Sequence, residues 1–170
     1  MIKQILISTI SKILPTKVAY AHCDIPCGIY DPYQAQLAAI SIIRMTGMIN
    51  DLKTSSSEPS FDERKKIIHQ ISRLTKVKEE HAEIVKHEVR VLWGDYFKEE
   101  HLKSYPDLHD LVFSIMKHAS GARQEINMEE SKELLEKVQE LAEIFWKTKS
   151  RKVTKIKSSS PSGEKIVVPQ

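Results

Sequence analysis

Eleven residues near the N-terminus, HCDIPCGIYDP from His22 to Pro32, hold the only two cysteines of the chain. Cys23 and Cys27 are separated by three residues, and a histidine directly precedes the first of them. Two prolines, one glycine and two aspartates in the same stretch disfavour a helix interior. We therefore expect a turned loop, called the hook below, that brings two thiols and one imidazole together.

The chemistry of the hook depends on where the mature chain begins. Residues 1–21 contain three lysines, no acidic residue and a short apolar run, and they end in Ala19-Tyr20-Ala21. Such a small-residue ending is typical of a peptidase cleavage site, so we expect a leader that is removed on maturation. An ordinary amphipathic N-terminal helix is the alternative. Cleavage after Ala21 would leave a free α-amine on His22.

A C-x-x-x-C pair taken alone fits a disulfide, a redox dithiol or half of a metal site. A new N-terminal His22 adds its amine, and Cys23 adds its thiolate and its backbone amide nitrogen. These groups are adjacent along the backbone and can close small chelate rings on one metal, with Cys27 as a further donor. Two nitrogens and two sulfurs in one plane suit Ni(II) or Cu(II) better than tetrahedral zinc.

Other common sites are absent from the sequence. No histidine follows an acidic residue by three positions, which excludes the E-x-x-H pattern of di-iron bundles. The chain also lacks an H-E-x-x-H motif, a Gly-rich phosphate loop and a second cysteine pair for structural zinc. We expect five further histidines to be surface or satisfied core residues: His69, His87, His101, His109 and His118.

The composition indicates one helical domain. Of the 170 residues, 41% are hydrophobic and 29% are charged, and only 5 are glycine, which suits helices better than a turn-rich β fold. The formal charge is +3, and removal of residues 1–21 with their three lysines leaves no net charge. We therefore expect no nucleic-acid partner. No run of roughly 18 apolar residues predicts a membrane span.

The spacing of apolar residues predicts four amphipathic helices joined by mostly short connections. Their N-terminal signals are Asp31 with Pro32, Ser60 with Glu63, the stretch 104–107, and Asn127 with Glu130. We expect the second helix to reach about Tyr96, the third to end near Gly121, and the fourth to end near Trp146.

Together these elements predict an all-α fold, an antiparallel four-helix bundle that carries an irregular metal-binding hook at its N-terminus. We divide the chain into a leader (1–21), a domain (22–149) made of the hook (22–32) and the helices (33–149), and a tail (150–170). The tail is rich in lysine and serine, so we expect it to be disordered and basic.

The hook resembles the nickel-binding hook of the nickel superoxide dismutases, including the cleavage point before His22. The similarity covers roughly residues 22–149. It continues at VLWGDYFK (Val91–Lys98), at His101, at Tyr105-Pro106 and at IFWKTK (Ile144–Lys149).

This resemblance implies an enzyme that converts superoxide to dioxygen and hydrogen peroxide by Ni(II)/Ni(III) cycling. One nickel ion per subunit would be bound by the His22 amine, the Cys23 amide nitrogen, and the thiolates of Cys23 and Cys27. The His22 imidazole would be an axial ligand in the oxidised state. The resemblance also implies a homohexamer with one hook on each subunit.

Three further residues correspond to family positions at the metal. Tyr30 and Tyr96 match two tyrosines that guard the open side of the metal, and the same rings can pack the hook onto the bundle. Asp24 matches a residue that helps to hold the shape of the hook.

Two positions depart from the family pattern, in which a glutamate and an arginine support the axial imidazole. The equivalent residues here are Ala38 and His81. The side chain of Ala38 cannot accept a hydrogen bond, whereas His81 could contact His22 directly or through water. These departures concern the support of the axial ligand and not the ligands themselves.

Two other functions fit the hook: a non-catalytic nickel or copper carrier or sensor, and a redox dithiol formed by Cys23 and Cys27. A dismutase needs metal and a maturation peptidase, whereas a dithiol needs neither. Because the thiols must stay reduced and the leader is a weak export signal, we expect a cytoplasmic protein. Export is the alternative if the leader acts as a signal peptide.

Overall fold

The computed structural model describes residues 28–170. The predicted leader and the predicted ligands His22, Cys23 and Cys27 lie outside the described residues, as does Asp24. Within residues 28–170, no helix is long and apolar enough to cross a membrane.

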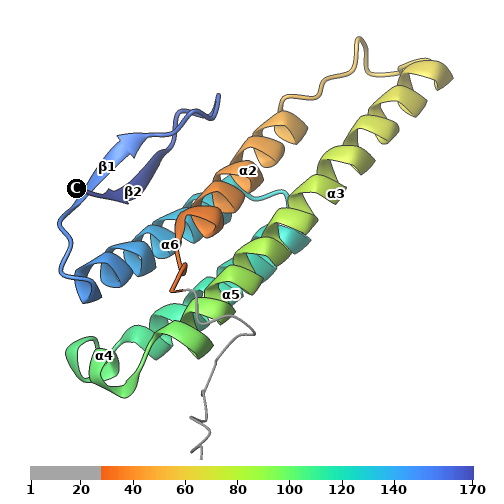
Figure 1. The fold of residues 1–170 in the computed structure, drawn as a ribbon. Coiled ribbons are helices and arrows are strands. Elements are labelled where there is room, and N and C mark those ends of the chain that lie inside the picture. The colour runs from red at the N-terminus through yellow and green to blue at the C-terminus, as the bar shows by residue number, and fades with distance from the viewer. Residues whose placement is uncertain (1–27) are drawn as a thin grey trace, which may run out of the picture.

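Four long helices form the body of the molecule (Figure 1). They run alternately up and down, and each packs against two neighbours in the order α2, α3, α5, α6. The predicted antiparallel four-helix bundle is therefore confirmed. The bounds are α2 (Tyr33–Asn50), α3 (Phe61–Val91), α5 (Leu108–Gln124) and α6 (Met128–Thr148).

Side-chain caps set the starts of three helices close to where the sequence predicts them. The backbone N–H of Tyr33 donates to Asp31 Oδ1 (2.7 Å) at the start of α2. The Ser60 hydroxyl accepts from the Glu63 N–H, and the Asn127 side chain accepts from the Glu130 N–H. Each cap satisfies a backbone donor that has no partner inside its helix.

The expected capping box at the start of α3 is only half formed. The Glu63 carboxylate accepts hydrogen bonds from the backbone N–H and the hydroxyl of Ser55, both at 2.7 Å, rather than from Ser60. These two bonds lower the pKa of Glu63. They also tie the α2–α3 connection back onto the first turn of α3.

The helix ends differ from the predictions in two places. The α-helical part of the second helix ends at Val91 and continues as a π-helical turn, η1 (Leu92–Tyr96), followed by the short helix α4 (Glu99–Ser104). Gly121 does not end α5, which runs to Gln124. A Cβ at Gly121 would lie 2.6 Å from Glu130 Oε1, so this glycine permits close approach of α6 instead of terminating α5.

The prediction that residues 150–170 are disordered is wrong. They form an antiparallel hairpin of β1 (Val153–Lys157) and β2 (Lys165–Pro169), which lies beside α2 and α6 (Figure 1). Both backbone groups of Val167 bind the buried Gln36 side chain, with the N–H donating at 2.7 Å and the carbonyl accepting at 3.1 Å. The lysine and serine content of the tail concealed the β-branched residues that make the strands.

A buried lysine joins α3 to the end of α5. The side chain of Lys78 is 1% exposed, and its ammonium donates to the carbonyls of Ala122, Arg123 (2.8 Å) and Glu125 (2.8 Å). Two of these carbonyls belong to the last turn of α5, which has no helical donors for them. Burial lowers the pKa of Lys78, and the three hydrogen bonds offset the desolvation of its charge.

We predict that Lys78→Met lowers the free energy of unfolding by about 3 kcal/mol, because three carbonyls at the end of α5 lose a charged donor. Urea unfolding followed by circular dichroism measures the change. The exposed Lys76, on the same helix, supplies the matched control, and Lys76→Met should change stability by less than about 0.5 kcal/mol. Equal effects of the two substitutions would contradict a role for the Lys78 bonds.

Candidate metal centre

Two tyrosines meet where the hook joins the bundle. Tyr30, near the end of the hook, packs against the core, and its ring centroid lies 5.7 Å from that of Tyr96. The two ring planes are tilted by 54°. Gly28, three residues before Asp31, has a φ of +61°, a left-handed conformation that favours glycine and turns the chain. The described part of the hook is thus fixed against Tyr96.

The π-helical turn η1 determines where Tyr96 points. The Phe97 N–H donates to the Leu92 carbonyl at 3.0 Å, which closes a wider turn than an α-helix has. A turn of this kind adds a residue and rotates the side chains that follow it. The apolar spacing predicts a regular helix to about Tyr96 and gives no sign of this turn.

Aromatic rings surround Tyr96 on several sides. Its centroid lies 4.6 Å from that of Phe145 on α6 and 5.2 Å from that of Phe97. The imidazole of His101 stacks on it at 5.6 Å with an interplanar angle of 15°. The Lys149 ammonium lies 5.4 Å from the ring centroid, where a cation is attracted to an aromatic face. Tyr96 is therefore held by α4, α6 and the turn that contains it.

The hydroxyl of Tyr96 has a defined hydrogen-bond direction. Thr148 Oγ1 donates its single hydrogen to the Phe145 carbonyl at 2.7 Å. Tyr96 Oη lies 2.7 Å from the same Thr148 oxygen, so Tyr96 must be the donor in that pair. The phenolic hydrogen points into the bundle, and the lone pairs of the oxygen stay available as acceptors. Thr148 belongs to the IFWKTK segment, to which the sequence analysis assigned no role.

Ala38 and His81 lie on the neighbouring helices α2 and α3. Ala38 is buried on α2, as its spacing predicts. His81 on α3 is half-buried, and its Nδ1–H donates to the Val77 carbonyl at 2.8 Å. Fifteen residues separate His81 from Tyr96, which is roughly 22 Å of helix axis. The eight residues from His22 to Tyr30 can span at most about 28 Å, so His22 can reach the level of His81.

The donor set of the hook fits nickel chemically. Thiolates are soft ligands, and a histidine with a free amine adds nitrogen donors, a combination that suits a square-planar Ni(II) ion. Among the described residues, Lys149 is a charged neighbour of Tyr96. The residues present therefore fit the metal that the hook sequence indicates.

Known proteins match this chain over most of its length. The sequence profile of the family described as nickel-containing superoxide dismutase matches residues 17–149. The nickel superoxide dismutase of Streptomyces coelicolor (strain ATCC BAA-471 / A3(2) / M145) is 36% identical over 141 residues, 82% of this chain and 98% of that protein. The enzyme of Streptomyces seoulensis has the same identity and coverage.

Solved structures match the fold as well. A nickel-containing superoxide dismutase with nickel ligation of the oxidised state has a TM-score of 0.64 at 36% identity, covering 76% of this chain and 99% of that one. A native nickel superoxide dismutase has a TM-score of 0.62 at 37% identity, covering 75% and 99%. The C-terminal hairpin lies beyond the residues that the family profile matches.

We predict that the Tyr96–Thr148 hydrogen bond contributes a coupling of about 1 kcal/mol to stability. A double-mutant cycle of Tyr96→Phe and Thr148→Val, measured by urea unfolding, isolates this pair from the other losses of each substitution. A second cycle that pairs Thr148→Val with Tyr105→Phe should give a coupling near zero. Additive effects in both cycles would contradict the Tyr96–Thr148 hydrogen bond.

Proposed function

The chain belongs to the nickel-containing superoxide dismutases, and we propose that its nickel centre is assembled at the hook after cleavage before His22. The enzyme is an oxidoreductase that converts superoxide to dioxygen and hydrogen peroxide with a nickel cofactor. The single observation that carries this function is the family match over residues 17–149. The alternative of a non-catalytic carrier or sensor has no support among the relatives.

The proposed ligands all come from the first residues of the mature chain. The His22 amine, the Cys23 amide nitrogen, and the thiolates of Cys23 and Cys27 would hold one nickel ion per subunit, and the His22 imidazole would be a further nitrogen donor. Bound there, nickel supplies the Ni(II)/Ni(III) couple that exchanges electrons with superoxide. Asp24 is proposed to hold the shape of the hook.

The residues around the hook would control access and orientation. Tyr30 and Tyr96 are proposed to flank the open side of the metal, where they admit small anions and exclude larger molecules. Because Tyr96 donates its hydrogen to Thr148, its oxygen would act as an acceptor for water or a protonated product. Lys149 would add positive charge beside this entrance and favour the approach of an anion.

Assembly, processing and compartment complete the proposal. We propose a leader (residues 1–21) that a peptidase removes, a homohexamer with one hook on each subunit, and a cytoplasmic location in which the thiols stay reduced. The absence of an acid in residues 1–21 and their Ala-Tyr-Ala ending support the cleavage.

We predict that protein starting at His22 removes superoxide at least tenfold faster per chain than the full-length protein, because only the former has the amine donor. Superoxide decay after pulse radiolysis, with intact mass and nickel content measured on the same samples, tests this. Protein starting at Ala21 is the matched control, because its free amine lies on Ala21 and not on His22. Its activity should resemble that of the full-length chain. Equal activity of all three forms would contradict the binding of nickel by the His22 α-amine.

We predict that His81→Ala lowers turnover per nickel by about tenfold while nickel content changes little, because His81 is proposed to support the His22 imidazole. The side chain of Ala38, which also departs from the family pattern, cannot form a hydrogen bond. His81 is therefore the polar side chain of the two that could support the imidazole. His87→Ala changes an exposed histidine of the same helix and should have no effect. Unchanged turnover per nickel in His81→Ala would show that His81 has no role in the reaction.

A further inference from the structure

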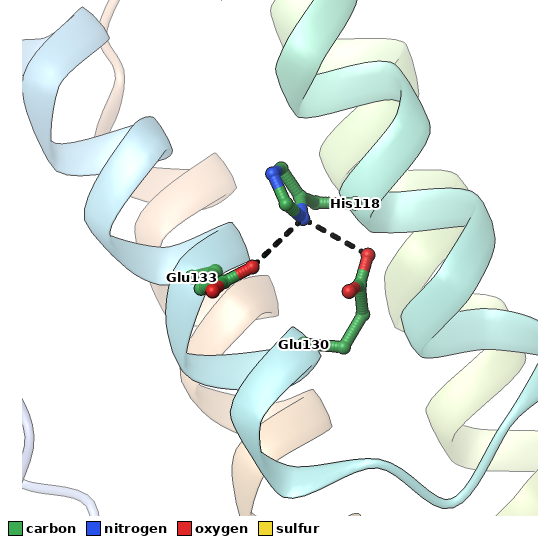
Figure 2. A group of neighbouring side chains, drawn as sticks. All are labelled: His118, Glu130 and Glu133. Atoms are coloured by element: carbon green, nitrogen blue, oxygen red, sulfur yellow. Dashed lines mark hydrogen bonds and ion pairs between the residues drawn. The ribbon is translucent and has the colours of Figure 1, made fainter.

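A histidine and two glutamates converge between α5 and α6, at the end of these helices away from Tyr96. Figure 2 shows His118 of α5 with one ring nitrogen directed at the carboxylates of Glu130 and Glu133 of α6. His118 Nδ1 lies 2.9 Å from Glu130 Oε1 and 3.4 Å from Glu133 Oε2. All three ligand atoms lie within 4.8 Å of one another. The sequence predicts an ordinary surface or satisfied core residue at His118, and its spacing gives no sign of this cluster.

The backbone around this cluster is arranged to bring the groups together. Gly121 lies one turn after His118, and any side chain there would collide with the Glu130 carboxylate. Glu130 itself is fixed through its N–H, which donates to the cap residue Asn127 at 3.1 Å. The close approach of the helices and the fixed first turn of α6 therefore preorganise two of the three groups.

The charges of the cluster are not balanced by protein groups. Among residues 28–170, neither Glu130 nor Glu133 forms an ion pair with a lysine or arginine, and both depend on His118. A neutral imidazole balances no charge, and a protonated one balances a single carboxylate. Arg123, close in sequence to His118, pairs with Glu83 instead. At least one negative charge thus remains without a counter-ion.

We propose that His118, Glu130 and Glu133 bind a divalent transition-metal ion, best fitted by Zn²⁺, at a second site independent of the nickel centre. Nitrogen and carboxylate ligands of tetrahedral Zn²⁺ lie about 3.3 Å from one another, close to the distances between His118 Nδ1 and the two carboxylates. Nδ1 would bind the metal through its lone pair, with the imidazole proton on Nε2. The partial exposure of all three side chains leaves a coordination position for water.

The site lies between two helices, where a bound metal would stabilise the fold. Glu133 lies fifteen residues before Thr148 on α6, which places the cluster roughly 22 Å from the Tyr96–Thr148 pair. A metal held by α5 and α6 would connect the two helices at the end away from Tyr96. Because the unfolded chain lacks the assembled site, binding should raise the thermal stability of the folded protein.

The test uses the full chain with Cys23→Ser and Cys27→Ser, so that no thiolate of the hook competes for metal. Titration with Co²⁺ should give visible absorption of a nitrogen and oxygen site without a sulfur charge-transfer band, and competition should give the Zn²⁺ affinity. We expect one Zn²⁺ per chain and a rise in melting temperature. His118→Ala and Glu130→Gln should each weaken Zn²⁺ binding at least about tenfold and remove that rise.

Glu129→Gln is the matched control, because it removes the same charge from the same turn of α6 without touching the cluster, and it should bind Zn²⁺ as the parent does. Glu130→Gln keeps the size of the side chain and serves if His118→Ala does not fold. If the parent binds no Zn²⁺, or if Glu130→Gln and Glu129→Gln bind it equally well, the cluster is an ion pair only and the proposal is overturned.

Discussion

The packing of Tyr30 on Tyr96 is the contact on which the relation between hook and bundle depends. It joins the last residues of an irregular loop to a ring that is held by Phe145, His101 and the hydroxyl of Thr148. A loop of eleven residues has no core of its own, so its position must come from such a contact. The π-helical turn and the end of α6 thus both hold Tyr96 where the hook joins the bundle.

Buried polar side chains make the remaining connections between elements. Lys78 binds the carbonyls that end α5, and Gln36 binds both backbone groups of Val167 in the hairpin. Each of these contacts satisfies backbone groups that burial would otherwise leave unpaired. These hydrogen bonds fix which elements pack together and in which register. Apolar packing alone defines both less sharply.

Local signals predicted much of this fold because they act within a few residues. The caps at Ser60 and Asn127 and the apolar stripes place the helices correctly, and the hook motif indicates the nickel chemistry. The π-helical turn, the hairpin and the use of Gly121 depend on contacts between segments distant in sequence. The hydrogen bond that Tyr96 donates to Thr148 spans 52 residues, and no spacing rule connects the two positions. Average composition likewise concealed the strands, since lysine and serine together outnumber the β-branched residues of residues 150–170.

The central claim is that cutting the chain creates a metal ligand, the α-amine of His22. Nickel K-edge X-ray absorption on nickel-loaded protein starting at His22, compared with the same protein carrying Ala21 in front, measures this most directly. The account predicts two sulfur and two or three nitrogen donors in the first protein and a changed nitrogen shell in the second. Identical nickel spectra for the two proteins would contradict it.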